Sequence, residues 1–169
     1  MSGVLVPAPL LNWFVNQPIS RDRYPPGLYL GQSGIAWVLA ELGYLERAVA
    51  IASDARRHDL LWSCDNMLHG CTGFGMAALK MWLVGCGPDF LESACAVGEH
   101  LMRRATEEIH GSYWRDHDGV PLGYPHGGSG IALFLLYLHL ATGEGDYLEL
   151  GRPGLPAWRK NCCRVTGGV

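Results

Sequence analysis

The sequence has neither a long apolar run nor a basic stripe, and both absences narrow the range of functions. Its apolar runs are too short to cross a bilayer, so no membrane span is expected. The 169 residues carry a formal net charge of −3 at pH 7, without the clustered Lys and Arg that bind a phosphate backbone, so no nucleic-acid partner is expected. With 49% apolar residues, the chain can build a core, and at this length one domain is expected.

A regular disulfide spacing is also missing, although six cysteines are present: Cys64, Cys71, Cys86, Cys95, Cys162 and Cys163. The apolar start, residues 1–15, lacks the basic segment that opens a secretory signal. Without an export signal, reduced thiols and a cytoplasmic location are expected. Cys71, Cys86 and Cys95 fall in predicted turns or helices, where they can serve as small core residues.

Glycine, by contrast, is abundant, and much of it belongs to a unit that occurs three times, in residues 28–39, 67–79 and 123–138. In each copy two glycines stand three residues apart and lead directly into an apolar segment. Because glycine lacks Cβ, the paired glycines are expected to allow a tight turn with positive φ and the close approach of a neighbouring backbone. A unit repeated in this way predicts a repeat architecture.

Each apolar segment is followed by a more polar one, at residues 44–58, 88–108 and 145–151. A helix that is apolar nearly all round is buried on most sides, whereas an amphipathic helix covers one face of a core. The pattern therefore predicts an all-α fold, a partial α/α toroid of inner and outer helix pairs. The glycine-rich turns would gather at one end, around a central cavity.

The repeats divide the chain into three expected regions. Residues 1–26 form an irregular lead-in with one short helix near residues 10–15, and residues 27–151 hold the three helix pairs. Within the second region, residues 110–122 form a polar connection that could carry a short strand or hairpin. Residues 152–169 have no apolar periodicity, so we expect a tail that is poorly ordered or foreign to the fold.

Three runs carry a resemblance to a known family: residues 27–36, residues 68–75 and, most specifically, residues 123–132 with their continuation 137–143. Over residues 27–151 the chain resembles the N-terminal portion of a lanthionine synthetase C-like (LanC-like) cyclase domain. It is most similar to the cyclase domain at the C-terminal end of class III lanthipeptide synthetases, in which a lyase and a kinase domain come first. The resemblance implies an α/α toroid related to six-hairpin α/α barrels.

The resemblance also implies an activity. In that family, a cysteine thiol of a precursor peptide adds to dehydroalanine or dehydrobutyrine, which closes a thioether (lanthionine) ring in lanthipeptide biosynthesis. Many members use zinc, held by two cysteines and a histidine, to lower the pKa of the thiol. The implied partners are the leader and core of the precursor peptide and the upstream kinase and lyase domains of a parent enzyme.

The family's site residues carry over to a few positions. His126 matches a histidine that faces the cavity as a proposed acid or base, and Asp65, or Asn66 one residue on, matches an acidic cavity residue. The resemblance further implies a cavity lining of His69, Gly70, Tyr124 and Gly127. The simpler structural roles for these side chains are a helix-start histidine bonded to backbone and a helix cap.

No metal site is expected in this chain, although the complete family domain holds zinc. The family's ligand turns, Trp-Cys-x-Gly and Cys-His-Gly, have no counterpart: Leu68 stands where the second would have its cysteine, and Cys162-Cys163 precedes no glycine-rich turn. His69 and Cys71 supply only two neighbouring ligands, and zinc requires three or four. The isolated chain is therefore expected to be inactive.

Two alternatives remain open. One is a truncated, catalytically inactive cyclase-like module that binds peptide. The other is a different α/α-toroid enzyme that acts on carbohydrate, which needs paired carboxylates beside the sugar; Asp116, Asp118 and Glu144 show no such pairing at the glycine-rich turns.

In every case an open ring leaves the last inner helix exposed, so we expect poor solubility or self-association.

Overall fold

Three helix pairs, preceded by one short helix, make up the structure, a computed structural model that describes residues 6–108, 111–115, 119–121 and 123–151. The helices are α1 (Ala8–Val15), α2 (Gln32–Glu41), α3 (Leu45–Arg56), α4 (Cys71–Leu83), α5 (Pro88–Arg104), α6 (Gly128–Thr142) and α7 (Gly145–Gly151). The predicted all-α class, with paired inner and outer helices, is confirmed. The predicted tail, residues 152–169, lies outside the described residues.

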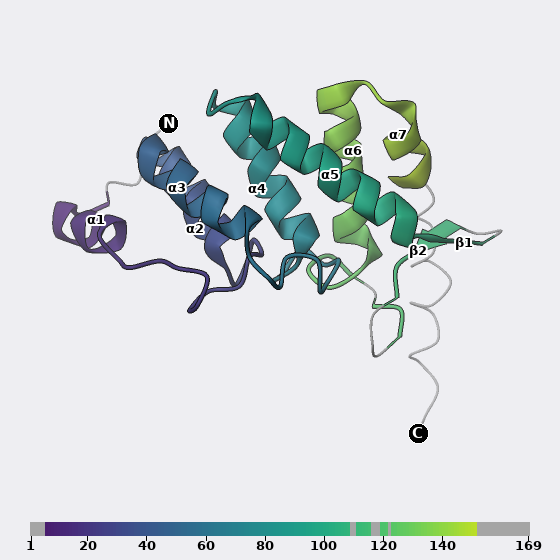
Figure 1. Ribbon diagram of the computed structural model, residues 1–169, viewed down its shortest axis with the longest axis horizontal. Coiled ribbons are helices and arrows are strands. Elements are labelled where there is room, and N and C mark those ends of the chain that lie inside the picture. Colours follow the sequence, from purple (N-terminus) through teal and green to yellow (C-terminus); the bar gives the residue numbers. More distant parts are fainter. Residues whose placement is uncertain (1–5, 109–110, 116–118, 122, 152–169) are drawn as a thin grey trace.

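The pairs stand side by side, as Figure 1 shows, and each inner helix contacts the outer helix that follows it in the chain. The inner helices α2, α4 and α6 also contact one another in that order. This arrangement is the arc of a toroid that the repeats predicted. Among the described residues, no helix is both long and apolar enough to span a membrane.

A two-stranded hairpin interrupts the helical pattern. Strands β1 (Thr106–Glu108) and β2 (Gly111–Tyr113) pair antiparallel, with Thr106 opposite Tyr113. The expectation of an outer helix through residue 108 was wrong, because α5 ends at Arg104 and the next residue is extended. Trp114 explains the early end: its ring is buried and its indole N–H donates to the Leu101 carbonyl at 2.9 Å. The chain therefore turns back over the last turn of α5.

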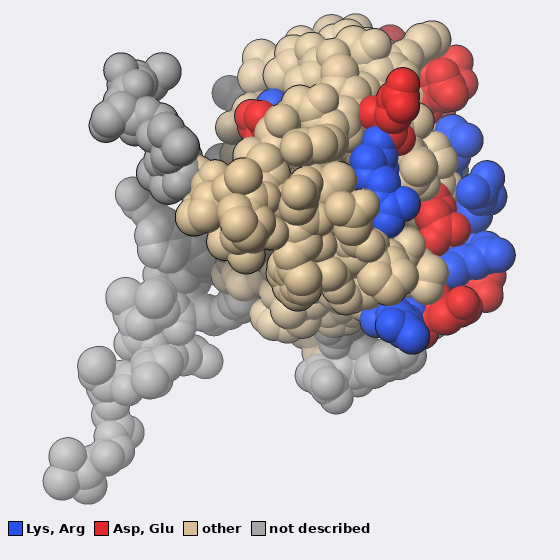
Figure 2. Space-filling view, turned by 90° about the vertical axis from the view of Figure 1, so that its left-hand side faces the viewer, with Lys and Arg blue, Asp and Glu red and all other residues tan. Residues whose placement is uncertain are grey.

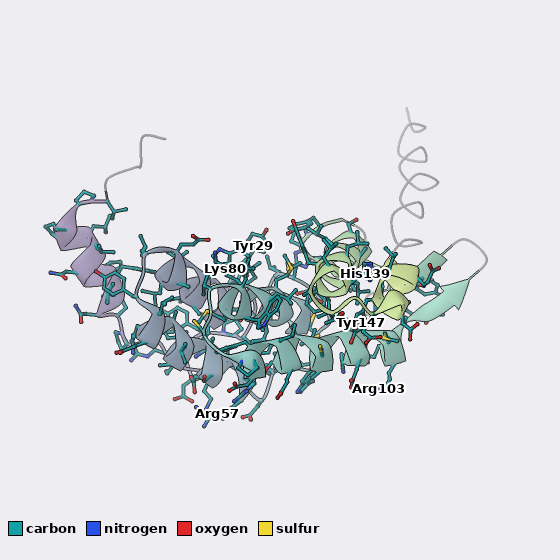
Figure 3. All side chains as sticks on the ribbon, turned by 90° about the horizontal axis from the view of Figure 1, so that it is seen from above. Tyr29, Arg57, Lys80, Arg103, His139 and Tyr147 are labelled. Atoms are coloured by element: carbon teal, nitrogen blue, oxygen red, sulfur yellow. The ribbon has the colours of Figure 1, made fainter. Side chains whose placement is uncertain are left out.

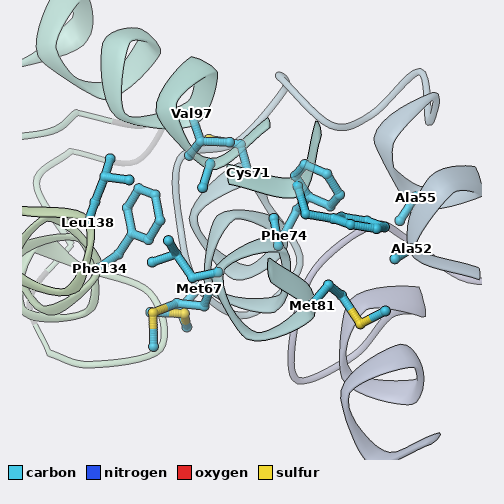
Figure 4. Close-up of a cluster of buried hydrophobic side chains, with 14 of the residues drawn as sticks. Ala52, Ala55, Met67, Cys71, Phe74, Met81, Val97, Phe134 and Leu138 are labelled. Atoms are coloured by element: carbon cyan, nitrogen blue, oxygen red, sulfur yellow. The ribbon is translucent and has the colours of Figure 1, made fainter. Parts of the chain in front are cut away.

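The core lies between the two layers of helices. Ten of the 13 residues of α4 are buried, which confirms the reading of an inner helix that is apolar nearly all round. Figure 4 shows Phe134 and Leu138 of α6 beside Val97 of α5. The outer helices are amphipathic, and in Figure 3 Arg57, which directly follows α3, and Arg103 of α5 project on the side opposite Tyr29 and Lys80.

Close backbone approach is what the paired glycines provide. A Cβ built on them would lie 1.9–2.3 Å from the carbonyl oxygen six residues upstream at Gly31, Gly34, Gly70, Gly73 and Gly130. None of these five has a positive φ, so that part of the expectation was wrong. Positive φ occurs instead at glycines such as Gly43 and Gly143, which follow inner helices.

Successive glycine-rich turns are joined by backbone hydrogen bonds. The N–H groups of Leu28 and Tyr29 donate to the carbonyls of Met67 and Leu68 at 3.2 and 3.0 Å. In the same way, the N–H groups of Met67 and Leu68 both donate to the Pro125 carbonyl, at 3.1 and 3.0 Å. The turns are thereby locked edge to edge, and side chains from different repeats are held at one end of the helix pairs.

Candidate functional site

A cavity of about 300 Å³ opens at the end of the molecule where the glycine-rich turns lie. The second turn, the end of α5, the segment after β2 and the start of α6 all contribute to its wall. The lining residues are Ser63, Cys64, Asp65, Asn66, Arg104, Trp114, Arg115, Pro121, His126, Gly127, Gly128 and Ile131. The cavity thus brings together Asp65 and His126, the two predicted catalytic residues, from different repeats.

Asp65 is the best-connected polar side chain of this region, and only 8% of it is exposed. Its Oδ2 accepts a hydrogen bond from Arg104 Nε at 2.7 Å, and its Oδ1 lies 3.0 Å from His100 Nε2. The hydrogen bond and charge of Asp65 raise the pKa of the Arg104 guanidinium. Because both partners come from α5, one carboxylate fixes two side chains of the outer helix against the second turn.

Asn66, and not the neighbouring acid, stabilises the second turn, although no side chain caps the helix that follows. Its Oδ1 accepts the backbone N–H of His69 at 3.1 Å, three residues on. The hydroxyl of Thr72 closes the same turn by donating to the Asp65 carbonyl, as Ser33 does to Pro26 in the first turn. The side chain of Asp65 is therefore not needed to form the turn.

His126 is exposed on the cavity wall and lies beside a second histidine. The ring centroids of His126 and His69 are 6.4 Å apart, at an interplanar angle of 69°. His69 itself does not appear among the lining residues of this cavity, and neither do Gly70 and Tyr124. Of the predicted lining residues, Gly127 alone belongs to its wall.

Tyr124 faces the first turn. Its ring centroid lies 6.2 Å from that of Tyr29 in an edge-on arrangement. Burial, followed by a hydrogen bond with Tyr29, raises the pKa of Tyr124 to about 12. The Tyr124 phenol therefore stays protonated at neutral pH and joins the third turn to the first through its contact with Tyr29.

One cluster of potential metal ligands was not predicted from the sequence. In the part of the chain that the structure describes, Asp65, Cys71 and His100 bring their ligand atoms within 4.8 Å of one another. Only His69 was considered beside Cys71, because His100 is 29 residues further along, on α5. The available signal was the spacing of His100 and Arg104, which puts two side chains on one face of a predicted helix.

Cys71 is the most deeply buried member of this trio, with no exposed surface. Burial, and then the charge of Asp65, raise the pKa of its thiol far above the usual range. In reduced, metal-free protein, we expect a maleimide to modify Cys71 much more slowly than the half-buried Cys86. Mass spectrometry of the modified peptides would measure both rates, and equal rates would contradict the prediction.

The same shift predicts how stability depends on pH. The unfolded thiol ionises from about pH 8.5 whereas the folded one does not, so the contribution is complete below that pH and is lost as pH rises above it. The loss for this single group is about 1.4 kcal/mol per pH unit. Urea unfolding between pH 7 and 10 should therefore show a smaller decline for Cys71→Ser than for the native chain. An equal decline would contradict the assignment.

Paired helices, glycine-rich turns and a cavity at the turn end define a protein of the α/α-toroid class. Residues 20–161 match the family model described as Lanthionine synthetase C-like protein, and the chain belongs to that family. Over 157 residues it is 28% identical to a Streptomyces coelicolor protein described as a probable SapB synthase. The alignment covers 89% of this chain and 17% of that relative, so the chain spans less than a fifth of its length.

Zinc is the metal that this family binds, and the trio contains suitable donors. Carboxylate oxygen, imidazole nitrogen and thiolate sulfur are the three protein ligand types of zinc. The 3.0 Å separation of Asp65 Oδ1 and His100 Nε2 is close to the ~3.3 Å expected between two light ligands of one tetrahedral zinc. The side chains present therefore fit the ion, although they are not the family's two cysteines and histidine.

Proposed function

We propose that this chain is the front portion of a lanthionine cyclase domain. The complete domain would add a cysteine thiol of a precursor peptide to dehydroalanine or dehydrobutyrine and so close thioether rings. The observation that carries the proposal is the shared cavity of Asp65 and His126 in a chain of the LanC-like family. Its partners would be the leader and core of that peptide, and kinase and lyase domains of a longer parent enzyme.

Thioether formation requires one carbon–sulfur bond to form and one proton to be delivered to carbon. The thiolate sulfur bonds to the β-carbon of the dehydro residue, which leaves an enolate whose α-carbon must then be protonated. His126, exposed on the cavity, would supply that proton as general acid. Arg104, oriented by Asp65, would place positive charge near the developing enolate oxygen. Zinc, when bound, lowers the pKa of a coordinated thiol.

A peptide-binding module without turnover is the second candidate, and one observation favours it. The sequence lacks the Trp-Cys-x-Gly and Cys-His-Gly turns that hold zinc in the family. A chain without those turns could still bind the precursor peptide across its exposed turn end, where Tyr29, Tyr124 and His126 offer polar and aromatic contacts.

The test combines a binding measurement with a chemical one. A dehydrated lanthipeptide precursor carrying a fluorophore would be titrated with the longer parent enzyme that contains this chain, and its free thiols would be counted over time by maleimide labelling and mass spectrometry. Peptide binding with loss of thiols supports the cyclase, and binding without loss supports the peptide-binding module. Absence of peptide binding would contradict both candidate functions.

His126→Asn separates acid catalysis from binding. If His126 donates the proton, the substitution should lower the ring-forming rate of the complete domain by about 10²–10⁴-fold and leave the Kd for the peptide nearly unchanged. His139→Gln is the matched control, because His139 lies near the far end of α6, where its Nδ1 is 2.8 Å from the Glu144 carbonyl. A rate unaffected by His126→Asn would exclude the proposed role.

A further inference from the structure

We infer that Asp65, Cys71 and His100 form a binding site for one zinc ion. The site is distinct from the two-cysteine, one-histidine site of the family, whose ligand turns are missing here. The inference does not rest on cyclase activity, since the chain can bind the ion whether or not it closes rings. It rests on three different donor types converging from the second turn, the start of α4 and the C-terminal part of α5.

The geometry needs little rearrangement. Asp65 Oδ1 and His100 Nε2 are 3.0 Å apart, and all three ligand atoms lie within 4.8 Å of one another. Around tetrahedral zinc, with bonds of about 2.0–2.1 Å to oxygen or nitrogen and about 2.3 Å to sulfur, the ligand atoms are about 3.3–3.6 Å apart. Shifts of about 1 Å or less would bring the three donors to a common ion.

Two of the three ligands, Asp65 and His100, are oriented by a neighbour, as ligands of metal sites usually are. Arg104 Nε binds Asp65 Oδ2 at 2.7 Å, which leaves Oδ1 on the side of His100. The ring of His100 lies against Trp62, with centroids 4.9 Å apart. These contacts fix the carboxylate and the imidazole before any ion arrives.

Cys71 is placed to become a thiolate. It is the first residue of α4, and no side chain caps that helix end. A cysteine at a helix N-terminus loses its proton more readily when a cation is near, because the helix dipole also favours the negative charge. Without an ion, the same thiol is buried beside the Asp65 carboxylate and remains protonated.

The charges balance when the ion binds. The Cys71 thiol releases one proton, the Cys71 and Asp65 anions together neutralise the two positive charges of zinc, and neutral His100 gives its Nε2 lone pair in place of the contact with Asp65. Arg104 keeps its partner on the other carboxylate oxygen, in the manner of a group bonded to a metal ligand. Because a proton is released, the affinity should rise with pH.

Three protein ligands leave one coordination position for water or an incoming thiol. Asp65 also lines the 300 Å³ cavity, so the ion would lie at the cavity wall.

The test uses the whole chain, reduced and freed of metal by a chelator. Cobalt(II) replaces zinc as a visible probe, because a tetrahedral cobalt–thiolate site gives intense ligand-field bands and a near-ultraviolet thiolate charge-transfer band. Zinc titrated afterwards should abolish these bands at about one ion per chain, and metal analysis after desalting gives the stoichiometry. Circular dichroism of each variant confirms that the helices remain.

Three substitutions and their controls locate the ligands. Cys71→Ser should remove the charge-transfer band. His100→Gln can still hydrogen-bond Asp65 but should weaken cobalt binding at least about 100-fold. Loss of a group that only hydrogen-bonds a ligand typically costs about 10–100-fold, so a direct ligand should cost at least the upper value. Asp65→Asn should weaken cobalt binding similarly. Cys86→Ser, His126→Asn and the double variant Cys162→Ser/Cys163→Ser should bind as the native chain does.

The outcomes are decisive in both directions. One cobalt per chain, lost in the Cys71 and His100 variants and kept in the controls, establishes the site. A folded native chain that binds no cobalt at micromolar concentration overturns the inference, and so does binding that survives in the Cys71 and His100 variants. None of these outcomes depends on peptide binding or ring formation, so failure here and failure of the proposed function are distinguishable.

Discussion

Replacing Gly70 with alanine should remove most of the stability of this chain. The added Cβ would lie 2.2 Å from the Cys64 carbonyl oxygen, 2.7 Å from its carbon and 3.0 Å from the Asn66 nitrogen. All three obstacles are backbone atoms, so no side chain can rotate away. We expect a loss of about 4 kcal/mol or more, at the extreme of single substitutions, against a total of about 5–15 kcal/mol for a typical domain.

The same substitution should also disturb the cavity. Relief of the clash requires residues 64–66 to move, and Asp65 is the carboxylate that holds His100 and Arg104. Urea unfolding followed by circular dichroism measures the loss of stability. In any Gly70→Ala protein that remains folded, metal binding by Asp65, Cys71 and His100 should be lost as well.

Gly128→Ala is the matched control for Gly70→Ala. Gly128 directly follows the first turn glycine of the third repeat and lines the cavity, yet its Cβ would meet only the Trp114 ring, at 3.9 Å. Alanine there should stabilise the chain by about 0.5 kcal/mol, because the unfolded chain loses freedom. Equal destabilisation by the two substitutions would refute the argument from backbone approach.

The sequence predicted the helices well because their causes are local. A three-fold unit of glycine pair and apolar segment located the inner helices, and Gly43, Gly85 and Gly143 marked their ends. The reason for the glycine pairs was half wrong, since contact with a carbonyl six residues upstream leaves φ negative. That contact depends on how the turn closes, which a pattern of residue types does not reveal.

The candidate site was only half predictable for a related reason. His126 and Asp65 were proposed through the resemblance to the LanC-like family, which matches them to cavity positions. His100 joins Asp65 across 35 residues, and Trp114 ends α5 by reaching back to Leu101. Such contacts depend on how an outer helix packs against a glycine-rich turn. From a single sequence, only the helical spacing of residues such as His100 and Arg104 points to them.

Self-association is the second large effect that we expect, and it begins with a mostly apolar hollow between the inner helices. The hollow, of about 500 Å³, is lined by Trp37, Met76, Leu79, Lys80, Trp82, Leu83, Tyr137, Leu140 and Ala141. Lys80, its one charged member, is already paired with Glu41 at 2.6 Å and lies over the Trp37 ring. In Figure 2 the charged side chains gather along one edge of the molecule, and most of the remaining face is uncharged.

Leu83 and Leu140 are the most exposed residues of this hollow, at 73% and 76%. In a closed toroid the inner helices would face further inner helices, whereas here α2, α4 and α6 form an arc with that side open. Burial of apolar surface is worth about 25 cal/mol per Å², so two chains gain by covering each other's hollow. We therefore expect a concentration-dependent dimer or larger assembly.

The double substitution Leu83→Lys/Leu140→Lys should convert that assembly to a monomer of about 18.5 kDa. Both side chains project into solvent in the single chain, so the free energy of unfolding should change by no more than about 0.5 kcal/mol. Leu60→Lys is the control, because Leu60 is also exposed, at 54%, but lies outside the hollow. Light scattering after size exclusion, over a range of loading concentrations, measures the mass. A native chain that stays monomeric throughout would contradict the prediction, and an equal effect of Leu60→Lys would show that added charge, and not the hollow, controls association.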